Sequence, residues 1–330
     1  MKSEKDHIQL FLKSLVTMNN FNVGIIGSSG FIGKSLVKRI LNNKNKDLQL
    51  YLFSRRIDNI FNNLTNVTFT SFDVQNFTHI PDELFEIEVL YYLVSDTIPA
   101  SSWNNCILEV TNNLLPFIHI IEKLTNGNLK KIVYTSSAGT VYGSSEYKIT
   151  ENSETSPFSP YGITKLTIEH FLHYFQIKHS ISYDIFRISN IYGPGQITSK
   201  GLGLINTILE NHANKEETII FGDGKNVRNY IYIDDVVNIL EKSIYSSRNE
   251  SNTINLASSD NISIVDLIQI IENSINEKLL LKYEMQRASD NPCISIDNSR
   301  LLNKYIDIKI TSLHKGILNT YDSILKSKKK

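Results

Sequence analysis

The chain has 330 residues, 41% apolar and 21% charged, and its 34 Lys and Arg balance its 34 Asp and Glu. This length and composition indicate a globular protein with one large α/β domain, or a large domain and a small one. The even charge argues against nucleic acid as a partner, and no run approaches the ~20 apolar residues that a membrane span needs. Cys106 and Cys293 fit neither a disulfide framework nor a zinc motif, so we expect a reducing, cytoplasmic location.

Apolar side chains at helical spacing within residues 8–16 predict a helical N-terminal extension over residues 1–20. Beyond it, short apolar or β-branched runs alternate with longer amphipathic ones. Strands are predicted at 23–26, 48–53, 67–72, 89–94, 131–135 and 183–188, and long helices at 103–124 and 160–179. The alternation predicts an α/β fold over residues 21–190, a Rossmann-type, doubly wound parallel sheet that would bind a dinucleotide.

After Asn190 the pattern changes, because prolines and glycines punctuate the chain and the segments become shorter. Helices are predicted at 204–211, 234–245, 264–276 and 313–325, with short strands near 218–221 and 253–256. We interpret residues 191–330 as a smaller C-terminal substrate-binding lobe over a cleft at the carboxyl ends of the strands. Its core is expected to share elements with the first lobe.

A glycine-rich stretch, GIIGSSGFIG at residues 24–33, lies between the first predicted strand and the helix that follows. Gly27, Gly30 and Gly33 allow a tight turn and a close approach of the backbone to a pyrophosphate. The new helix, beginning near Phe31 and Ile32, presents free N–H groups to the same anion. The spacing differs from the usual G-x-G-x-x-G, but its place at a strand-to-helix junction favours dinucleotide binding over an ordinary turn.

A tyrosine and a lysine, Tyr161 and Lys165, stand four residues apart at the start of the helix predicted for 160–179. This spacing places them on one face of the helix, one turn apart. A lysine ammonium stabilises a phenolate and would lower the pKa of Tyr161 toward neutrality. The pair is therefore suited to proton transfer when a carbinol and a carbonyl interconvert.

Hydroxyl-bearing residues follow the strand predicted for 131–135, in the sequence TSSAGTVYG. Hydroxyls at the carboxyl end of such a strand can point into the ligand crevice and hold a substrate oxygen. The alternative is a turn whose hydroxyls bond their own backbone.

Two polar clusters could suggest a metal ion. His170 and His173 lie three residues apart on a predicted helix, but no carboxylate or third ligand with suitable spacing joins them. Asp234 and Asp235 are better explained as a helix N-terminus favoured by the helix dipole. We therefore predict no metal site.

Together these motifs resemble the extended short-chain dehydrogenases/reductases of the NAD-dependent epimerase/dehydratase family, enzymes of nucleotide sugars. The resemblance covers residues 22–325. It implies that Asn190, in RISNIYGPGQ, touches the substrate and that Arg228, in FGDGKNVRNYIYIDDV, binds the substrate diphosphate. Arg287 resembles a later arginine that also reaches the phosphates, and two arginines are suitable bidentate partners of a pyrophosphate.

The resemblance also implies that the tyrosine–lysine pair is catalytic and that a nearby serine or threonine assists it. That family position is Ala138 here, so Ser137 or Thr140 would supply the hydroxyl instead. The Asp-Glu pair of 4,6-dehydratases would fall at Gly139 and Thr140 and is absent. This argues against dehydration, which needs an acid and a base at the sugar's C5 and C6.

The choice between NAD and NADP depends on the end of the strand at 48–53. NAD-preferring members carry an acidic residue there, whereas this chain has Ser54, Arg55 and Arg56. Two arginines could hold a 2′-phosphate, so the sequence favours NADP, although exposed arginines are also a common solvated feature. The other residues that the resemblance assigns to the cofactor are Asp73 and Val74, near adenine, and Asn113.

The implied activity is epimerisation at C4 of a UDP- or dTDP-hexose through a transient 4-keto sugar. Tyr161 would take the C4 hydroxyl proton while hydride passes to the nicotinamide, and Lys165 would tune Tyr161 and bind the nicotinamide ribose. An alternative is an NADP-dependent reductase of a 4-keto-6-deoxy nucleotide sugar, favoured by the arginines after the second strand. A third hypothesis, a non-catalytic dinucleotide sensor, is favoured by Ala138 alone. The resemblance also implies a homodimer in which the two long helices form a four-helix bundle.

Overall fold

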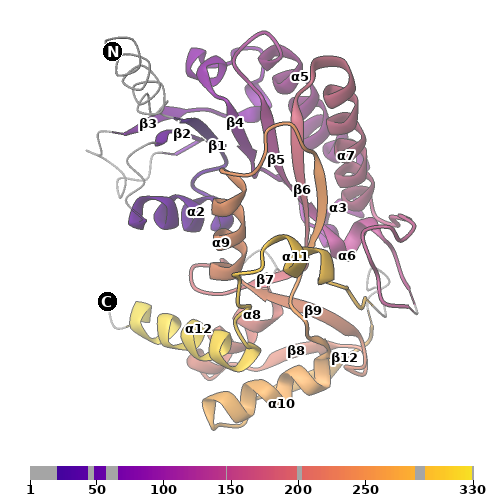
Figure 1. Ribbon diagram of the computed structural model, residues 1–330. Helices are drawn as coiled ribbons and strands as arrows, with labels where there is room; N and C mark the ends of the chain where they lie inside the picture. The colour runs from indigo at the N-terminus through magenta and orange to yellow at the C-terminus, as the bar shows by residue number, and fades with distance from the viewer. Residues whose placement is uncertain are drawn as a thin grey trace, which may run out of the picture.

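The structure is a computed structural model that describes residues 21–43, 48–56, 66–145, 147–198, 203–286 and 294–328. It has a large part built on a sheet and a smaller part beneath it in the view of Figure 1. The helix predicted within residues 1–20 lies outside the described residues, as do Arg287 and Cys293.

Seven parallel strands form the central sheet in the order β10-β6-β5-β4-β1-β2-β3. They are β1 (Phe21–Ile26), β2 (Leu48–Ser54), β3 (Val67–Ser71), β4 (Val89–Tyr92), β5 (Lys131–Ser137), β6 (Ser182–Ile188) and β10 (Asn252–Leu256). The direction of winding reverses between β1 and β4, which is the switch point where such sheets bind ligands. The Rossmann-type, doubly wound sheet predicted from the sequence is confirmed.

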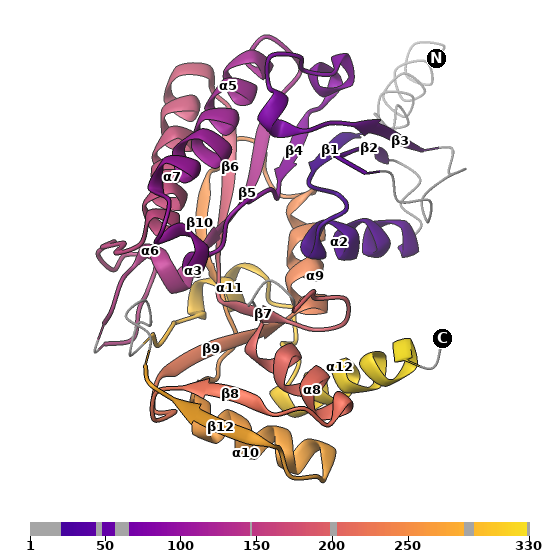
Figure 2. The ribbon, with the colours of Figure 1, turned by 180° about the vertical axis from the view of Figure 1, so that it is seen from behind.

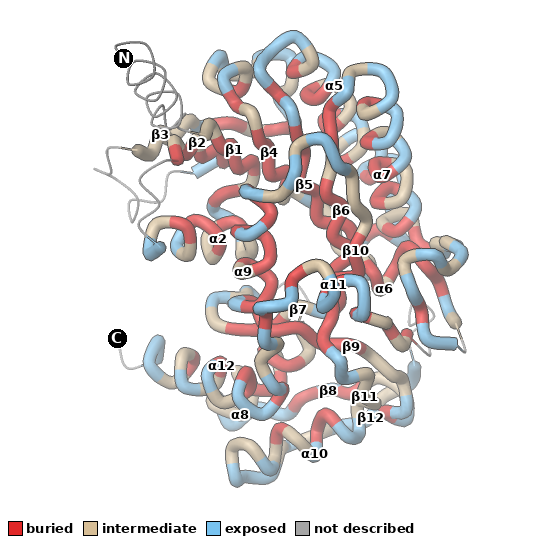
Figure 3. The backbone as a smooth tube through the Cα atoms, viewed as in Figure 1, coloured by how far each residue is buried: buried red, intermediate tan, exposed pale blue. Residues whose placement is uncertain are grey.

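Helices cover both faces of this sheet, as Figures 1 and 2 show. On one face α2 (Phe31–Asn42) packs against α9 (Ile233–Ser243), and on the other α5 (Leu115–Leu124) packs against α7 (Pro160–His179). Alternate residues of each strand point to opposite faces, so Ile25 belongs to one apolar cluster and Ile26 to the other. The buried segments in Figure 3 accordingly run through the inner strands, whose side chains are apolar on both faces, as in other parallel sheets.

The prediction of one helix over 103–124 is wrong at its first three residues, because the continuous helical segment begins at Cys106. A short helix, α3 (Pro99–Ser102), ends before Trp103, and the Asn105 side chain then caps α4 (Cys106–Glu109) by accepting from the Leu108 N–H at 3.2 Å. Asparagine bonds nearby backbone readily and favours helix ends. A π-helical turn, η4 (Val110–Leu114), leads into α5, where Pro116 has no N–H to continue the regular ladder.

The smaller part consists of two short sheets and three main helices. A three-stranded sheet pairs β7 (Asn190–Tyr192), β9 (Val227–Tyr232) and β11 (Asn261–Ser263), and a two-stranded sheet pairs β8 (Thr218–Phe221) with β12 (Leu281–Glu284). The helix α12 (Leu313–Lys328) packs on α8 (Leu204–Asn214) and α10 (Ile264–Ile275).

The remaining short elements of the described chain are η2 (Val74–Asn76), η3 (Asp82–Glu86), α6 (Ala138–Val141) and α11 (Ser299–Lys304).

The chain crosses back from the smaller part into the larger one. The strand predicted near 253–256 is β10, and it lies beside β6 at the edge of the central sheet rather than in the smaller part. The side chains of Asn238 and Glu241 in α9 accept hydrogen bonds from Arg39 of α2 at 2.6 and 2.8 Å. None of the helices formed by the described residues combines the length and apolar character needed to cross a membrane.

Candidate active site

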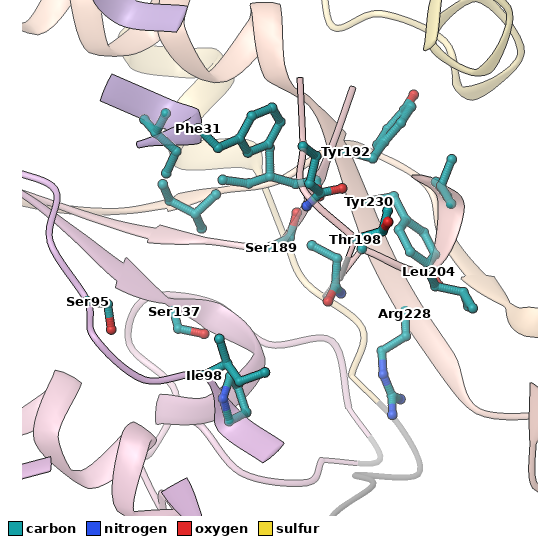
Figure 4. Close-up of a pocket in the computed structure, with 18 of the residues that line it drawn as sticks. Phe31, Ser95, Ile98, Ser137, Ser189, Tyr192, Thr198, Leu204, Arg228 and Tyr230 are labelled. Carbon is teal, nitrogen blue, oxygen red and sulfur yellow. The ribbon is translucent and has the colours of Figure 1, made fainter. Parts of the chain in front are cut away.

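A cavity of about 740 Å³ opens at the carboxyl ends of the inner strands, between the two parts of the molecule. Figure 4 shows Ser95, Ile98 and Ser137 on one side of it and Leu204, Arg228 and Tyr230 of the smaller part on the other. The structure brings together at this cavity half of the predicted site residues: Gly30, Phe31, Ile32, Gly33, Ser137, Tyr161, Lys165, Asn190 and Arg228.

The turn between β1 and α2 is a cradle in which side chains would not fit. Gly27 has a φ of +91°, and a Cβ on Gly33 would lie 2.2 Å from the Gly27 carbonyl oxygen. The Gly30 position before α2 offers no side-chain cap, so the N–H groups of the first turn keep their capacity to bind an anion. These features fit the pyrophosphate of a dinucleotide.

The residues at the end of β2 lie beside this turn. The Gly27 N–H donates to the Phe53 carbonyl at 2.9 Å, which ties the turn to β2. The buried Ser54 hydroxyl donates to the Arg56 carbonyl at 2.8 Å, so its hydrogen bond is made within the loop. Arg55 and Arg56 are exposed. The predicted position of a ribose or 2′-phosphate contact is therefore open to solvent.

The end of β3 adjoins the end of β2, because the Phe72 N–H donates to the Ser54 carbonyl at 3.1 Å. Asp73 caps the short turn η2 by accepting from the Gln75 N–H at 3.1 Å, and Val74 is buried. The two residues predicted near adenine thus stand at the same edge of the sheet as the glycine turn.

Asn113 lies behind the cavity wall. Its side-chain oxygen accepts from the Asp96 N–H at 2.8 Å, and its amide donates to Thr97 Oγ1 at 2.9 Å and Glu109 Oε2 at 3.1 Å. These bonds fix the loop that carries Ser95 along the cavity. Asn113, predicted as a cofactor contact, is not itself among the residues that line the cavity.

Local structure at the start of α7 presents the tyrosine–lysine pair. The Ser159 side chain caps the helix by accepting from the Gly162 N–H at 3.1 Å, and both Tyr161 and Lys165 face the cavity in the first two turns. The Lys165 ammonium nitrogen donates to the Thr135 carbonyl at 3.0 Å and lies 5.4 Å from the centre of the Tyr161 ring.

The pKa of each residue of the pair is shifted toward its neutral form. Burial, reinforced by the charge of Glu109, raises the pKa of Tyr161 to about 12, although a hydrogen bond with Ser95 opposes the shift. Burial lowers the pKa of Lys165 to about 8 against the pull of Glu109 and Glu169. In the protein alone the pKa of Tyr161 thus moves away from neutrality, opposite to the expected direction, because burial is the largest cause of the shift.

The two candidate hydroxyls after β5 occupy different positions. Ser137, the last residue of the strand, lines the cavity. Thr140 is buried in α6, and its hydroxyl has no hydrogen-bond partner among the described residues and is not part of the cavity lining. Ala138 is fully buried in a cluster with Val141 and Tyr142.

On the other wall, Asn190 and Arg228 lie on neighbouring strands, β7 and β9, and the Asn190 amide donates to the Asn229 carbonyl at 2.9 Å. Ser189 and Gln196 also line the cavity, and each has a buried oxygen without a hydrogen-bond partner among the described residues. Because buried polar atoms are nearly always paired, these oxygens are candidate contacts to a bound molecule. Sequence reasoning missed both, although they stand within the segment that it singled out.

Two buried glutamates near Lys165 were also missed. Glu169 of α7 accepts from both Nε and Nη2 of Arg187, at 2.6 to 3.1 Å, and from the Ser136 hydroxyl at 2.5 Å. Glu109 is 1% exposed in α4. A glutamate within an apolar helical run, as in Ile107-Leu108-Glu109-Val110, is the signal that could have found them.

A glycine turn and a Tyr-x-x-x-Lys pair at the switch point of a doubly wound parallel sheet define a dinucleotide-dependent short-chain dehydrogenase/reductase. The model of the NAD dependent epimerase/dehydratase family matches residues 23–257. This match covers most of the chain, including the turn, the pair and Arg228. The chain therefore belongs to that family.

Individual proteins extend this likeness. The chain is 29% identical to UDP-glucose 4-epimerase of Mycolicibacterium smegmatis over 219 residues. This aligned region is 64% of this chain and 70% of that protein. It is 27% identical over 271 residues to dTDP-4-dehydro-6-deoxyglucose reductase of Escherichia coli, 79% of this chain and 84% of that one. In fold the chain is similar to UDP-glucuronic acid 4-epimerase of Bacillus cereus, which was solved in complex with UDP-glucuronic acid and NAD. The TM-score is 0.83 and the identity 24%, and the alignment covers 93% of this chain and 100% of that one.

Proposed function

We propose that this protein is a nucleotide-sugar epimerase that inverts C4 of a UDP- or dTDP-hexose through a transient 4-keto sugar. The observation that carries the proposal is one cavity that joins the glycine cradle, Tyr161 with Lys165, and Arg228 of the smaller part. The cradle suits a dinucleotide, the pair suits a carbinol–carbonyl interconversion, and Arg228 suits a diphosphate. Several curated relatives are 4-epimerases of UDP-glucose.

In this proposal Tyr161 takes the proton from the C4 hydroxyl and later returns it. Its pKa of about 12 makes it a poor base at neutral pH without nearby positive charge. Lys165 supplies one such charge, held in place by the Thr135 carbonyl. The residues of the glycine turn would hold NAD, which when bound would supply the hydride chemistry and the positive charge of its nicotinamide. Ser137 donates a hydrogen bond to the C4 oxygen.

The smaller part holds the rest of the substrate. Arg228 and Asn190 bind the diphosphate and neighbouring sugar atoms, and Arg287, outside the described residues, is a second candidate for the phosphates. The unpartnered oxygens of Ser189 and Gln196 are suited to hydroxyls of the sugar, which can donate to them.

The cofactor that we infer is NAD. Several proteins of similar fold have been solved with NAD bound, and they lend no support to the NADP preference that Arg55 and Arg56 suggest. Both arginines are exposed at the end of β2, where an arginine pair is also explained by solvation alone. Reduction of a 4-keto-6-deoxy nucleotide sugar stays the second candidate, because the Escherichia coli reductase is a relative of similar identity.

The experiment that tests this function uses freshly purified protein with UDP-glucose, UDP-galactose and their N-acetyl and uronic acid forms. Retained nucleotide is identified by mass spectrometry of the denatured supernatant. We expect bound NAD and conversion of at least one sugar to its C4 epimer without net consumption of NADH or NADPH.

A Tyr161→Phe variant should retain the cofactor and lose activity about a hundredfold or more, as expected on removal of a general acid–base. Full activity in this variant would exclude the proposed chemistry. Steady oxidation of NADPH by a 4-keto-6-deoxy nucleotide sugar would instead make the protein a reductase.

A further inference from the structure

Glu109 is a buried carboxylate that the proposed chemistry leaves unexplained. It ends the short helix α4 and is 1% exposed. One oxygen, Oε2, accepts from the Asn113 amide at 3.1 Å, and Oε1 is buried without a hydrogen-bond partner among the described residues. Burying a charged group in this way is costly unless an opposite charge lies close by.

Lys165 is the cation whose pKa the charge of Glu109 affects. Both α4 and the π turn that follows it pack against α7, the helix that carries Lys165, and Glu109 is not among the residues that line the cavity. Its charge is the main one acting on the pKa of Lys165, and it also raises the pKa of Tyr161.

The other carboxylate that acts on the pKa of Lys165 is already matched by a cation. Glu169, on the same helix, forms an ion pair with Arg187 at 2.6 Å. Glu109 makes no ion pair with any described residue within 4.0 Å. From β5, the Thr135 carbonyl and the Tyr134 ring face the Lys165 ammonium, and the centre of that ring is 4.9 Å away. On α7 itself, the centre of the Tyr161 ring lies 5.4 Å from the same nitrogen.

We propose that Glu109 is a positioning residue that acts through Lys165. Its carboxylate balances the ammonium from behind the cavity wall and keeps the lysine charged beside Tyr161. The inference rests on the proposed roles of Tyr161 and Lys165 and adds a third member to their pair. Asn113, which holds Oε2, also holds the loop after β4, so the same amide aligns the carboxylate and that wall of the cavity.

Removing the charge of Glu109 should move two pKa values in the same direction. Lys165 would lose the carboxylate that opposes its burial, so its pKa would fall below about 8. Tyr161 would lose a negative neighbour, so its pKa would fall as well. If activity needs a deprotonated Tyr161 and a protonated Lys165, both limbs of the pH profile should shift to lower pH.

The direct test is a carbon-13 NMR titration of the Lys165 Cε, in protein with labelled lysine and without substrate. The resonance is assigned with Lys165→Arg. We expect a midpoint near 8 in the wild-type chain and a fall of roughly one unit in Glu109→Gln, as expected on loss of a nearby opposite charge.

Three variants complete the experiment. Glu109→Asp keeps the charge and should restore most of the wild-type midpoint. Glu122→Gln removes an exposed carboxylate from α5 and should leave the midpoint unchanged. Glu109→Met is a second neutral replacement of similar length, for use if Glu109→Gln does not fold.

An unchanged Lys165 midpoint in a folded neutral variant overturns the inference, and this outcome does not depend on any sugar being a substrate. The pH profile of epimerisation supplies the second readout. A rate that falls in Glu109→Gln while both limbs stay in place would also overturn it, because Glu109 would then act only through Asn113 and the loop.

Discussion

Ser137 and Thr140 stand close together in the sequence, but only Ser137 lines the cavity. Its position at the end of β5 places it in the lining of the cavity that Tyr161 and Lys165 also line, whereas Thr140 is buried in α6 against the start of α7. A Cβ on Gly162 would lie 2.5 Å from the Thr140 carbonyl oxygen, which shows how closely the two helices approach. The two residues should therefore respond differently to substitution.

We expect Ser137→Ala to lower kcat by about tenfold to a hundredfold with little effect on stability, since it removes a hydrogen bond to the reacting oxygen. Thr140→Val, which keeps the shape and removes an unpartnered hydroxyl, should leave kcat within about twofold. Steady-state kinetics and thermal unfolding of both variants measure these effects. A large loss of kcat in Thr140→Val with Ser137→Ala fully active would assign the catalytic hydroxyl to Thr140.

The pKa of about 8 for Lys165 predicts a pH dependence that an ordinary lysine would not give. The charged form of Lys165 is the active one in this mechanism. The contribution of Lys165 to kcat/KM should therefore be constant below about pH 7, and kcat/KM should fall above about pH 8 as the ammonium loses its proton. In Lys165→Arg the guanidinium stays charged over this range. We expect the variant to be slower at neutral pH, because a guanidinium fits the Thr135 contact poorly, and to lose the alkaline fall.

The control for this prediction is Lys178→Arg, which changes an exposed lysine on the same helix. Its pH profile should match that of the wild-type chain. An alkaline fall that persists at the same pH in Lys165→Arg would assign the limb to another group.

At the scale of elements, the glycine turn depends on a backbone contact that cannot adjust. A Cβ on Gly33 would lie 2.2 Å from the Gly27 carbonyl oxygen, and backbone moves far less readily than the end of a side chain. We expect Gly33→Ala to cost about 1–3 kcal/mol of stability through overpacking and to abolish retention of the dinucleotide.

Thermal unfolding and the nucleotide released on denaturation measure both effects. The matched control is Gly139→Ala, where a Cβ would meet nothing within 4 Å. Wild-type retention of the dinucleotide in Gly33→Ala would show that the turn does not hold the pyrophosphate.

The elements also show which features a sequence can predict. The six strands of the first part were predicted because each is a short apolar run, and those predictions end within about three residues of the observed bounds. The start of the helix after Asn105 was missed, because the capping bond that begins α4 depends on one side chain that the apolar pattern does not reveal. The strands β7 and β9 were missed because their pairing joins distant segments, such as Asn190 with Tyr230.

The candidate site shows a similar division. Gly33, Tyr161 and Lys165 could be predicted because each belongs to a local motif with a physical reason for its spacing. The position of Thr140 behind the wall and the burial of Glu109 depend on how α4, α6 and α7 pack together, and one sequence does not carry that packing. The pKa direction of Tyr161 was wrong for the same reason, because burial of the ring is a property of the folded molecule.

At the scale of the whole molecule, one exposed apolar surface stands out. On α7 it follows a helical stripe through Ile163, Tyr174 and Ile177, and it continues across Trp103, Ile107, Leu108, Val110, Leu115 and Phe158. The rings of Trp103 and Phe158 lie 6.3 Å apart within the second group, and the packing of α4 against α7 brings the two groups together. Large exposed apolar patches of this kind mark interaction sites. We propose that a second copy of the chain covers this one, in the helical pairing that the family resemblance implies.

We expect light scattering at micromolar concentration to give two chains per particle for the wild type and one for the double variant Ile107→Glu, Ile177→Glu. These side chains are 69% and 73% exposed, so the substitutions leave the core intact and bury charge only when two copies meet. The control is Ile306→Glu, whose side chain is 80% exposed outside the patch and whose substitution should leave the mass unchanged. Because Tyr161 lies at the start of the same helix, a dimer would also stiffen the catalytic wall, so the double variant should lose activity together with mass. A mass of one chain per particle for the wild type would contradict the proposed pairing.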